Sequence, residues 1–276
     1  MIAMSRLTLG LLHLQSLLGQ LAAFVLAPLY FILIRLMGYR VRELSALRER
    51  CAREFAAHRG PWIFCANHLT MIDSLIIAYT MLPLHRLLFR YRFLPWNLPE
   101  RDNFYGNPLL MILCYLTKCI PVQRGGSREK MAEVLEKCTY LLRKEHTLMI
   151  FPEGGRSRTG RIDRENFSYG VGRFVRDIEN CRVMCLYLRG DGQSAYGTIP
   201  RYRERFTVMM ETFMPERLEA GGLRAQRGYA AQIVGRLAEM EETYFAARGQ
   251  RYRGPEGVTE PGQEPGYALS GPGLHR

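Results

Sequence analysis

The architecture of this chain depends on residues 62–74, which read WIFCANHLTMIDS. Residues 62–66 are apolar and rich in aromatic and branched side chains, which is typical of a buried strand. Residues 67–70 are mostly polar and predict a corner, and the apolar run over residues 71–81 predicts a helix. A strand that passes through a short corner into a helix is the repeating unit of an α/β fold.

Two residues of this segment, His68 and Asp73, are five positions apart. On one regular helix they would lie about 140° apart around the axis and could not meet, so His68 must lie in the corner. From there its imidazole could reach the Asp73 carboxylate, which would set the tautomer and stabilise the imidazolium. The pair therefore has the composition of a general base with its orienting carboxylate.

The same residues allow a second interpretation, in which Asp73 is structural. The pattern Thr70-x-x-Asp73 resembles a capping box with Asp in place of Glu, so the carboxylate could bond a backbone N–H at the start of the helix. A corner of this kind also brings helix N-terminal N–H groups close to a site where negative charge could develop. These residues alone leave the catalytic and the capping interpretation open.

Length, charge and cysteine usage narrow the class of protein. The alternation of strand-like and helix-like segments over 276 residues predicts one α/β domain with appendages. A net charge of +12 favours an anionic partner: nucleic acid, an acidic membrane surface, or a phosphorylated or CoA-like substrate. The seven cysteines form no C-x-x-C pair, which indicates reduced thiols in a cytosol-facing protein, no zinc site and no disulfide framework.

The amino terminus predicts a membrane anchor. Residues 7–34 contain no Asp, Glu, Lys or Arg, and as one helix they would span about 42 Å, enough to cross a hydrocarbon core of about 30 Å. Polar residues in the first half and Pro28 in the second allow either one helix or a two-helix interfacial hairpin. Arginines follow the run far more often than they precede it, which places the bulk of the protein on the cytoplasmic side.

The rest of the chain divides around this anchor. We expect a hydrophobic anchor over residues 1–42, one α/β domain over residues 43–248, and a disordered Gly- and Pro-rich tail over residues 249–276. Basic and aromatic residues alternate in residues 82–96, which favours a membrane-facing surface with Phe93 and Trp96 in the lipid, although a core strand is the alternative. Because the basic residues adjoin an anchor and no nucleic-acid motif occurs, we expect no nucleic-acid partner.

Two further loops carry polar side chains. Residues 147–151 predict a buried strand that ends in PEGGRSRTG, where glycines let the backbone approach a ligand and Arg156 could form a fork onto an anion. Residues 118–126, KCIPVQRGG, predict a short strand that delivers Arg124 to a flexible loop. The carboxyl ends of strands are where open α/β sheets place their sites, so the histidine corner and the PEGGRS loop are expected at one edge.

Three elements in register resemble the glycerolipid acyltransferase family, whose members include 1-acyl-sn-glycerol-3-phosphate and lysophospholipid acyltransferases. The elements are NH-x4-D over residues 67–73, IPVQR over residues 120–124 and FPEGGRS over residues 151–157. The resemblance covers residues 60–215 and implies a single mixed sheet flanked by helices. It favours a catalytic role for Asp73 over the capping interpretation.

The resemblance implies transfer of an acyl group from an acyl-CoA or acyl-carrier-protein thioester to the hydroxyl of a lysolipid acceptor. His68 would be the general base and Asp73 its partner. The residues that would bind substrate are Asn67, Arg124, Glu153, Gly154 and Arg156. Direct attack by the hydroxyl needs no covalent acyl-enzyme, and we expect no metal and no cofactor beyond the thioester co-substrate. Donors near the helix N-terminus and bound water are both open as partners of the oxyanion.

The chain departs from the family pattern at three places. Lys118 stands where the second element often begins with glycine, Gly155 replaces a threonine, and the strand over residues 183–188 lacks the usual proline. These departures leave the reaction type intact and leave the acceptor headgroup open. Two other functions fit the residues: hydrolysis of a thioester or lysolipid ester by the same histidine, and non-catalytic lipid binding.

Overall fold

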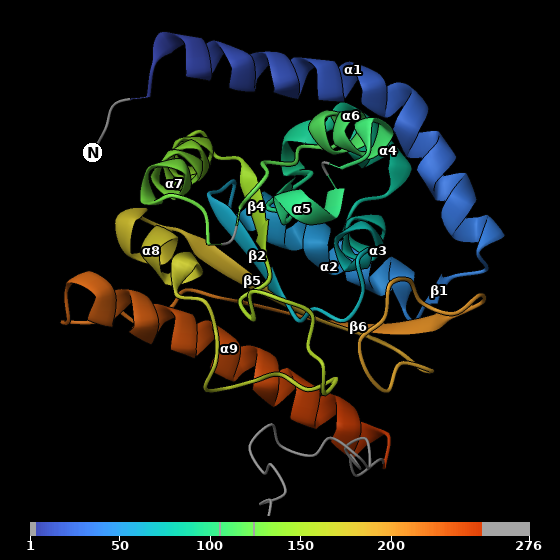
Figure 1. The fold of residues 1–276 in the computed structure, drawn as a ribbon. Helices are drawn as coiled ribbons and strands as arrows, with labels where there is room; N and C mark the ends of the chain where they lie inside the picture. The colour runs from blue at the N-terminus through green and yellow to red at the C-terminus, as the bar shows by residue number, and fades with distance from the viewer. Residues whose placement is uncertain (1–3, 105, 124, 250–276) are drawn as a thin grey trace, which may run out of the picture.

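The computed structural model describes residues 4–104, 106–123 and 125–249. Within these residues a six-stranded mixed sheet forms, with the order β1-β6-β5-β2-β4-β3 (Figure 1). The strands are β1 Arg40–Val41, β2 Trp62–Ala66, β3 Trp96–Asn97, β4 Thr147–Ile150, β5 Arg182–Gly190 and β6 Arg205–Phe213. Neighbouring strands are parallel except for β5 and β6, which are antiparallel. The predicted tail, apart from Gly249, lies outside the described residues.

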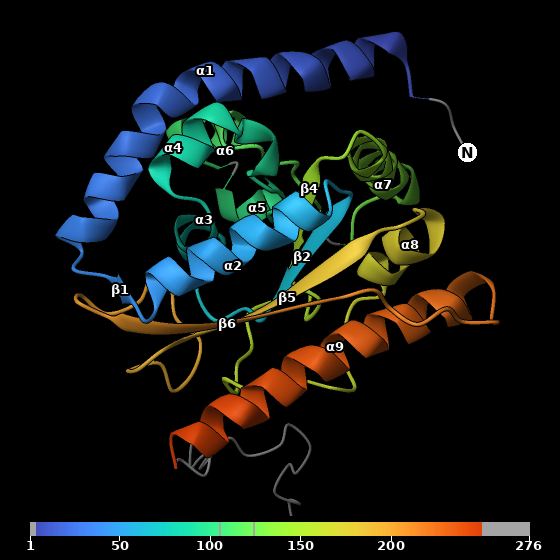
Figure 2. The ribbon, with the colours of Figure 1, turned by 180° about the vertical axis from the view of Figure 1, so that it is seen from behind.

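Helices cover both faces of this sheet. They are α1 Arg6–Leu36, α2 Leu44–Ala57, α3 Asp73–Met81, α4 Leu84–Phe89, α5 Arg101–Phe104, α6 Pro108–Leu116, α7 Arg128–Arg143, α8 Gly170–Asp177 and α9 Gly222–Ala247, with a 3₁₀ turn at Tyr91–Phe93. Helices α7, α8 and α9 lie on one face, and α2 crosses the other face beneath the arch of α1 (Figure 2). The single mixed sheet with flanking helices that the resemblance implied is therefore present.

The central strands are buried on both sides because each sends alternate side chains to opposite faces. In β2, Ile63 and Cys65 belong to the core shared with α7, α8 and α9, whereas Phe64 and its alternate neighbours pack on the face of α2 and α3. All five β2 residues are buried. This explains why the segment reads as a continuous apolar run without visible alternation.

The strand register brings three loops to one edge of the sheet. β2 pairs in parallel with β4, with Cys65 opposite Ile150, so the corner after β2 and the loop after β4 leave the sheet at the same level. Residues 119–122 extend this edge through parallel bridges between Asn97 and Cys119 and between Glu100 and Val122. Gln123 therefore lies at the same carboxyl edge, although Arg124, the predicted site residue that follows it, lies outside the described residues.

The hydrophobic run at the amino terminus is one helix, α1, with Pro28 inside it, which decides between the single helix and the hairpin. In Figure 1 it curves over α6 and α4 and then descends toward β1. The side chain of Gln15 donates to the carbonyls of Tyr115 and Cys119, each at 3.0 Å. A Cβ on Gly19 would lie only 2.7 Å from a carbonyl oxygen of α6, so a small residue is required where the two helices meet.

The prediction for residues 82–96 is wrong in one respect. Phe93 and Trp96 are 8% and 0% exposed, because the turn after α4 folds both rings into the protein. Phe93 stacks on Phe55 of α2 with the ring centroids 4.4 Å apart. The aromatic side chain that does reach the surface here is Phe89, at 72% exposed.

Candidate active site

His68 and Asp73 meet at the carboxyl end of β2. His68 lies in the loop between β2 and α3, and its Nδ1 is 3.1 Å from Oδ2 of Asp73, the first residue of α3. The His68 side chain is 20% exposed and that of Asp73 is 2% exposed, so the imidazole reaches solvent and the carboxylate does not. The structure thus has the geometry that the five-residue spacing required.

The carboxylate of Asp73 caps the helix and orients the histidine at once. Its Oδ2 accepts from the backbone N–H groups of Leu69 and Thr70 at 2.6 and 2.8 Å, and its Oδ1 accepts from the Thr70 hydroxyl. The two interpretations of the sequence were therefore not exclusive. Because an ionised carboxylate only accepts, Nδ1 of His68 carries the proton and Nε2 keeps its lone pair.

The backbone N–H groups of the corner are already used. Each of the four N–H groups of residues 68–71 donates within the protein. The acceptors are the Glu153 carboxyl for His68, Asp73 for Leu69 and Thr70, and the Thr198 carbonyl for Met71. None of these four groups is available to an oxyanion in this structure.

Glu153 reaches the corner from the neighbouring strand end. Its Oε1 accepts from the His68 N–H at 2.9 Å, and burial raises the pKa of this carboxyl to about 8, with the nearby charge of Asp73 adding to the shift. Phe151 stacks on the imidazole of His68 at 4.1 Å between ring centroids. Gly154 has a φ of +68°, a left-handed conformation that closes the turn back onto Phe151.

The structure places two other predicted site residues in backbone contacts. The Asn67 side chain accepts from Leu188 N–H and donates to Leu188 C=O, so it extends the pairing of β2 with β5. Arg156 donates to the Gly197 carbonyl at 2.9 Å and lies over the ring of Tyr196. Asn67 thus ties the corner to β5, and Arg156 ties the loop after β4 to the loop over residues 190–200.

A basic cavity lies near the end of the third loop at this edge. It has a volume of about 250 Å³ and includes Gln123. Its charged side chains are Arg101, Lys130, Lys137 and Glu133, of which Lys137 and Glu133 form an ion pair at 2.6 Å. Within the described residues, no group of three or more His, Cys, Asp and Glu side chains is arranged to hold a metal ion.

Sequence reasoning missed part of the site. Ser157 donates its N–H to the His68 carbonyl at 2.8 Å, and Gly197 donates to the Leu69 carbonyl at 2.9 Å. Glu241, on α9, holds the loop that contains Ser157 through Arg161. The sequence did contain a signal for Glu241, because it follows Leu237 by four residues and so falls on the apolar stripe of α9. A carboxylate at such a position is expected to be buried and paired with a basic side chain.

Comparison with known proteins agrees with this geometry. A family model described as Acyltransferase matches residues 41–189, more than half of the 276-residue chain. The matched region contains His68, Asp73, Glu153 and Arg156. No curated protein matches the chain. With the family model over most of the sheet and the histidine corner inside it, the chain belongs to the acyltransferase family.

Proposed function

We propose that the protein is a membrane-associated O-acyltransferase that moves an acyl chain from an acyl-CoA or acyl-carrier-protein thioester to the hydroxyl of a lysolipid. The observation that carries the proposal is the His68–Asp73 pair, with Nδ1 bonded to the buried carboxylate and Nε2 left to accept a proton. A 1-acyl-glycerol-3-phosphate or a related lysolipid is the proposed acceptor.

The reaction needs one proton shuttle. Nε2 of His68 removes the hydroxyl proton of the acceptor while the hydroxyl oxygen bonds to the thioester carbonyl carbon. The carbon–sulfur bond then breaks, and the imidazolium returns the proton to the departing thiolate. Asp73 stabilises the imidazolium between these steps, as the carboxylate does in other histidine-based acyl transfers.

Positive charge at the carboxyl edge of the sheet supports an anionic substrate. Arg101 and Lys130 line the cavity beside Gln123, and phosphate groups of the donor or the acceptor suit such a site. Glu153 and Arg156 border the histidine corner, where the acceptor must present its hydroxyl. We propose these side chains, with Arg124, Asn67 and Gly154, as the substrate-binding set.

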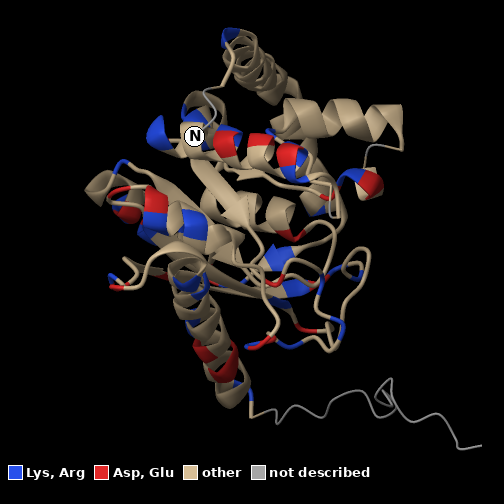
Figure 3. Ribbon diagram, turned by 60° about the vertical axis from the view of Figure 1, so that its left-hand side comes forward, with Lys and Arg blue, Asp and Glu red and all other residues tan. Residues whose placement is uncertain are grey.

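An exposed apolar surface supports membrane association. Of the residues that the structure describes, α1 is the one helix long and apolar enough to cross a membrane, and only 22% of its most apolar window is buried. In Figure 3 the helices at the top of the molecule are almost entirely tan, whereas the blue and red segments lie below them. Neighbouring helices expose Phe89, Leu109, Leu110, Met111 and Ile112. We propose that these side chains and the outer face of α1 contact lipid, with the catalytic domain on the cytoplasmic side.

Product analysis of the purified protein tests the activity. Mass spectrometry after incubation with a panel of lysolipids and each thioester should detect an acylated lipid. His68→Ala should lower turnover at least about a hundredfold, because it removes the general base. The matched control is His85→Ala, which removes an exposed imidazole on α4 and should leave turnover unchanged. Free fatty acid as the only product would instead identify a hydrolase, and unchanged turnover in His68→Ala would refute the base assignment.

A further inference from the structure

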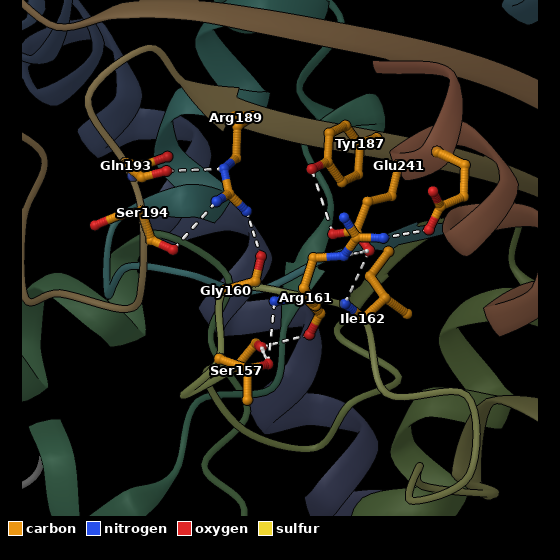
Figure 4. Close-up of polar contacts among 11 residues, drawn as sticks. Ser157, Gly160, Arg161, Ile162, Tyr187, Arg189, Gln193, Ser194 and Glu241 are labelled. Carbon is orange, nitrogen blue, oxygen red and sulfur yellow. Dashed lines mark hydrogen bonds and ion pairs between the residues drawn. The ribbon is translucent and has the colours of Figure 1, made fainter. Parts of the chain in front are cut away.

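A buried carboxylate on the last helix, Glu241, has no part in the reaction above. It is 2% exposed although α9 packs on the sheet with apolar side chains. Figure 4 shows its three partners: Arg161 Nε at 2.9 Å, the Ile162 N–H at 3.2 Å and the Tyr187 hydroxyl at 3.4 Å. Burial of an ion is unfavourable unless it is paired, so this carboxylate holds its three partners in a defined arrangement.

The loop that Glu241 holds also touches the catalytic histidine. Arg161 and Ile162 follow the Glu153–Arg156 segment, and the Arg161 carbonyl accepts from the Ser157 hydroxyl. Ser157 in turn donates its N–H to the carbonyl of His68 at 2.8 Å. A continuous chain of contacts therefore runs from α9 to the backbone of the general base.

A second arginine ties the same loop to the other side of the corner. Arg189, at the end of β5 and 3% exposed, donates to the carbonyls of Gly160, Gln193 and Ser194 (Figure 4). The segment that begins with Gln193 continues to Gly197 and Thr198. The Gly197 N–H donates to the Leu69 carbonyl, and the Thr198 carbonyl accepts from the Met71 N–H. The corner is therefore bonded by Glu153 and by two loops, residues 157–162 and residues 193–198. Glu241 binds the first loop, and Arg189 binds both.

We propose that Glu241 is a positioning residue for acyl transfer, which sets the loop over residues 157–162 and through it the placement of the His68 imidazole. The residue lies outside the matched family region, residues 41–189, and contributes from the carboxyl-terminal helix. The proposal rests on His68 acting as the base. Because misplacement of a reacting group by about 1 Å can lower the rate about a hundredfold, a group remote from substrate can act through geometry alone.

The test compares Glu241→Ala, Glu241→Gln and Glu239→Ala in full-length protein with a lysolipid acceptor that the wild type acylates. Glu239→Ala is the control, because Glu239 is exposed on the same helix and does not touch the loop. Glu241→Ala should lower kcat about tenfold or more, with KM for both substrates unchanged within about twofold. In Glu241→Gln the amide oxygen can take the place of Oε2, which accepts from the Ile162 N–H and Arg161 Nε, and the NH2 group can donate to the Tyr187 hydroxyl oxygen, so this variant should recover most of that loss.

Three outcomes would overturn the proposal: kcat in Glu241→Ala equal to that of Glu239→Ala, a loss confined to KM, or no recovery by glutamine. If the alanine variant does not fold, Arg161→Met replaces it, since it removes the ion pair with Glu241. Because Arg161 also pairs with Glu242, Glu242→Gln is the control that removes that second pair alone. The kcat of Arg161→Met should fall below that of Glu242→Gln with KM unchanged, and equal kcat values would again refute the role. A wild-type protein that acylates no lysolipid refutes the proposed function instead, so the two failures are distinguishable.

Discussion

At the scale of single residues, Glu153 determines the charge beside His68, the proposed general base. Burial raises its pKa to about 8 from an ordinary value of 4.5, so this carboxyl keeps its proton through neutral pH. Above that pKa it becomes a carboxylate close to Asp73, and in the proposed reaction a second negative charge would then face the developing oxyanion and an anionic acceptor. We therefore expect the neutral form to be the active one.

The pH profile of acyl transfer tests this assignment. The rate should fall as the pH rises past about 8, because Glu153 loses its proton there. Glu153→Gln, which cannot ionise, should lose this alkaline limb and keep a rate near that of the wild type at neutral pH. Glu179→Gln, which alters an exposed carboxylate in the turn after α8, should keep the limb. An alkaline limb that persists in Glu153→Gln would assign it to another group.

At the scale of elements, Lys118 holds the turn after α4. Its side chain is 0% exposed, and Nζ donates to the carbonyls of Tyr91 and Leu94 at 2.7 and 3.0 Å. The ammonium also lies 4.3 Å from the ring centroid of Tyr91. Burial lowers the pKa of Lys118 to about 7 from 10.5. Lys118, at the position where the family often has glycine, thus connects the segment after α6 to the turn after α4 through hydrogen bonds.

This shift makes stability depend on pH. Between about pH 7 and about pH 10 the unfolded chain binds a proton at Lys118 that the folded protein does not, so the free energy of unfolding rises with pH in this range. The upper limit of the rise is about 5 kcal/mol for a shift of this size. Lys118→Met should remove the rise, and Lys144→Met, an exposed control, should not. Denaturant titrations at several pH values measure the free energy of unfolding. If this free energy depends on pH equally in the wild type and in Lys118→Met, the burial argument is contradicted.

At the scale of the whole molecule, one side exposes apolar surface without charge. The outer face of α1 lies beside Phe89 of α4 and residues 109–112 of α6, all exposed. Arg90 is also exposed at the end of α4, where it can meet anionic headgroups. Contact between α1 and α6 through Gln15 and Gly19 keeps these helices in one surface.

Sedimentation with vesicles of mixed neutral and anionic phospholipid tests whether this surface binds membranes. The triple variant Phe89→Asp, Leu109→Asp, Ile112→Asp should weaken vesicle binding at least about tenfold, because each charge would enter the lipid. Leu223→Asp is the matched control, since Leu223 is 66% exposed at the start of α9. Binding that survives the triple variant unchanged would exclude α4 and α6 from the lipid contact.

The sequence by itself determined the local elements of this protein. The apolar runs predict β2 and the uncharged α1, and the spacing of His68 and Asp73 places the histidine outside the helix. These features depend only on residues that are close together in the sequence. Only the tertiary structure decided which distant groups meet: that Asp73 serves helix and histidine together, that the corner N–H groups are all occupied, that Trp96 is buried, and that Glu241 pairs with Arg161. The partner of a buried polar group depends on strand order and helix packing, and an apolar pattern is compatible with many such arrangements.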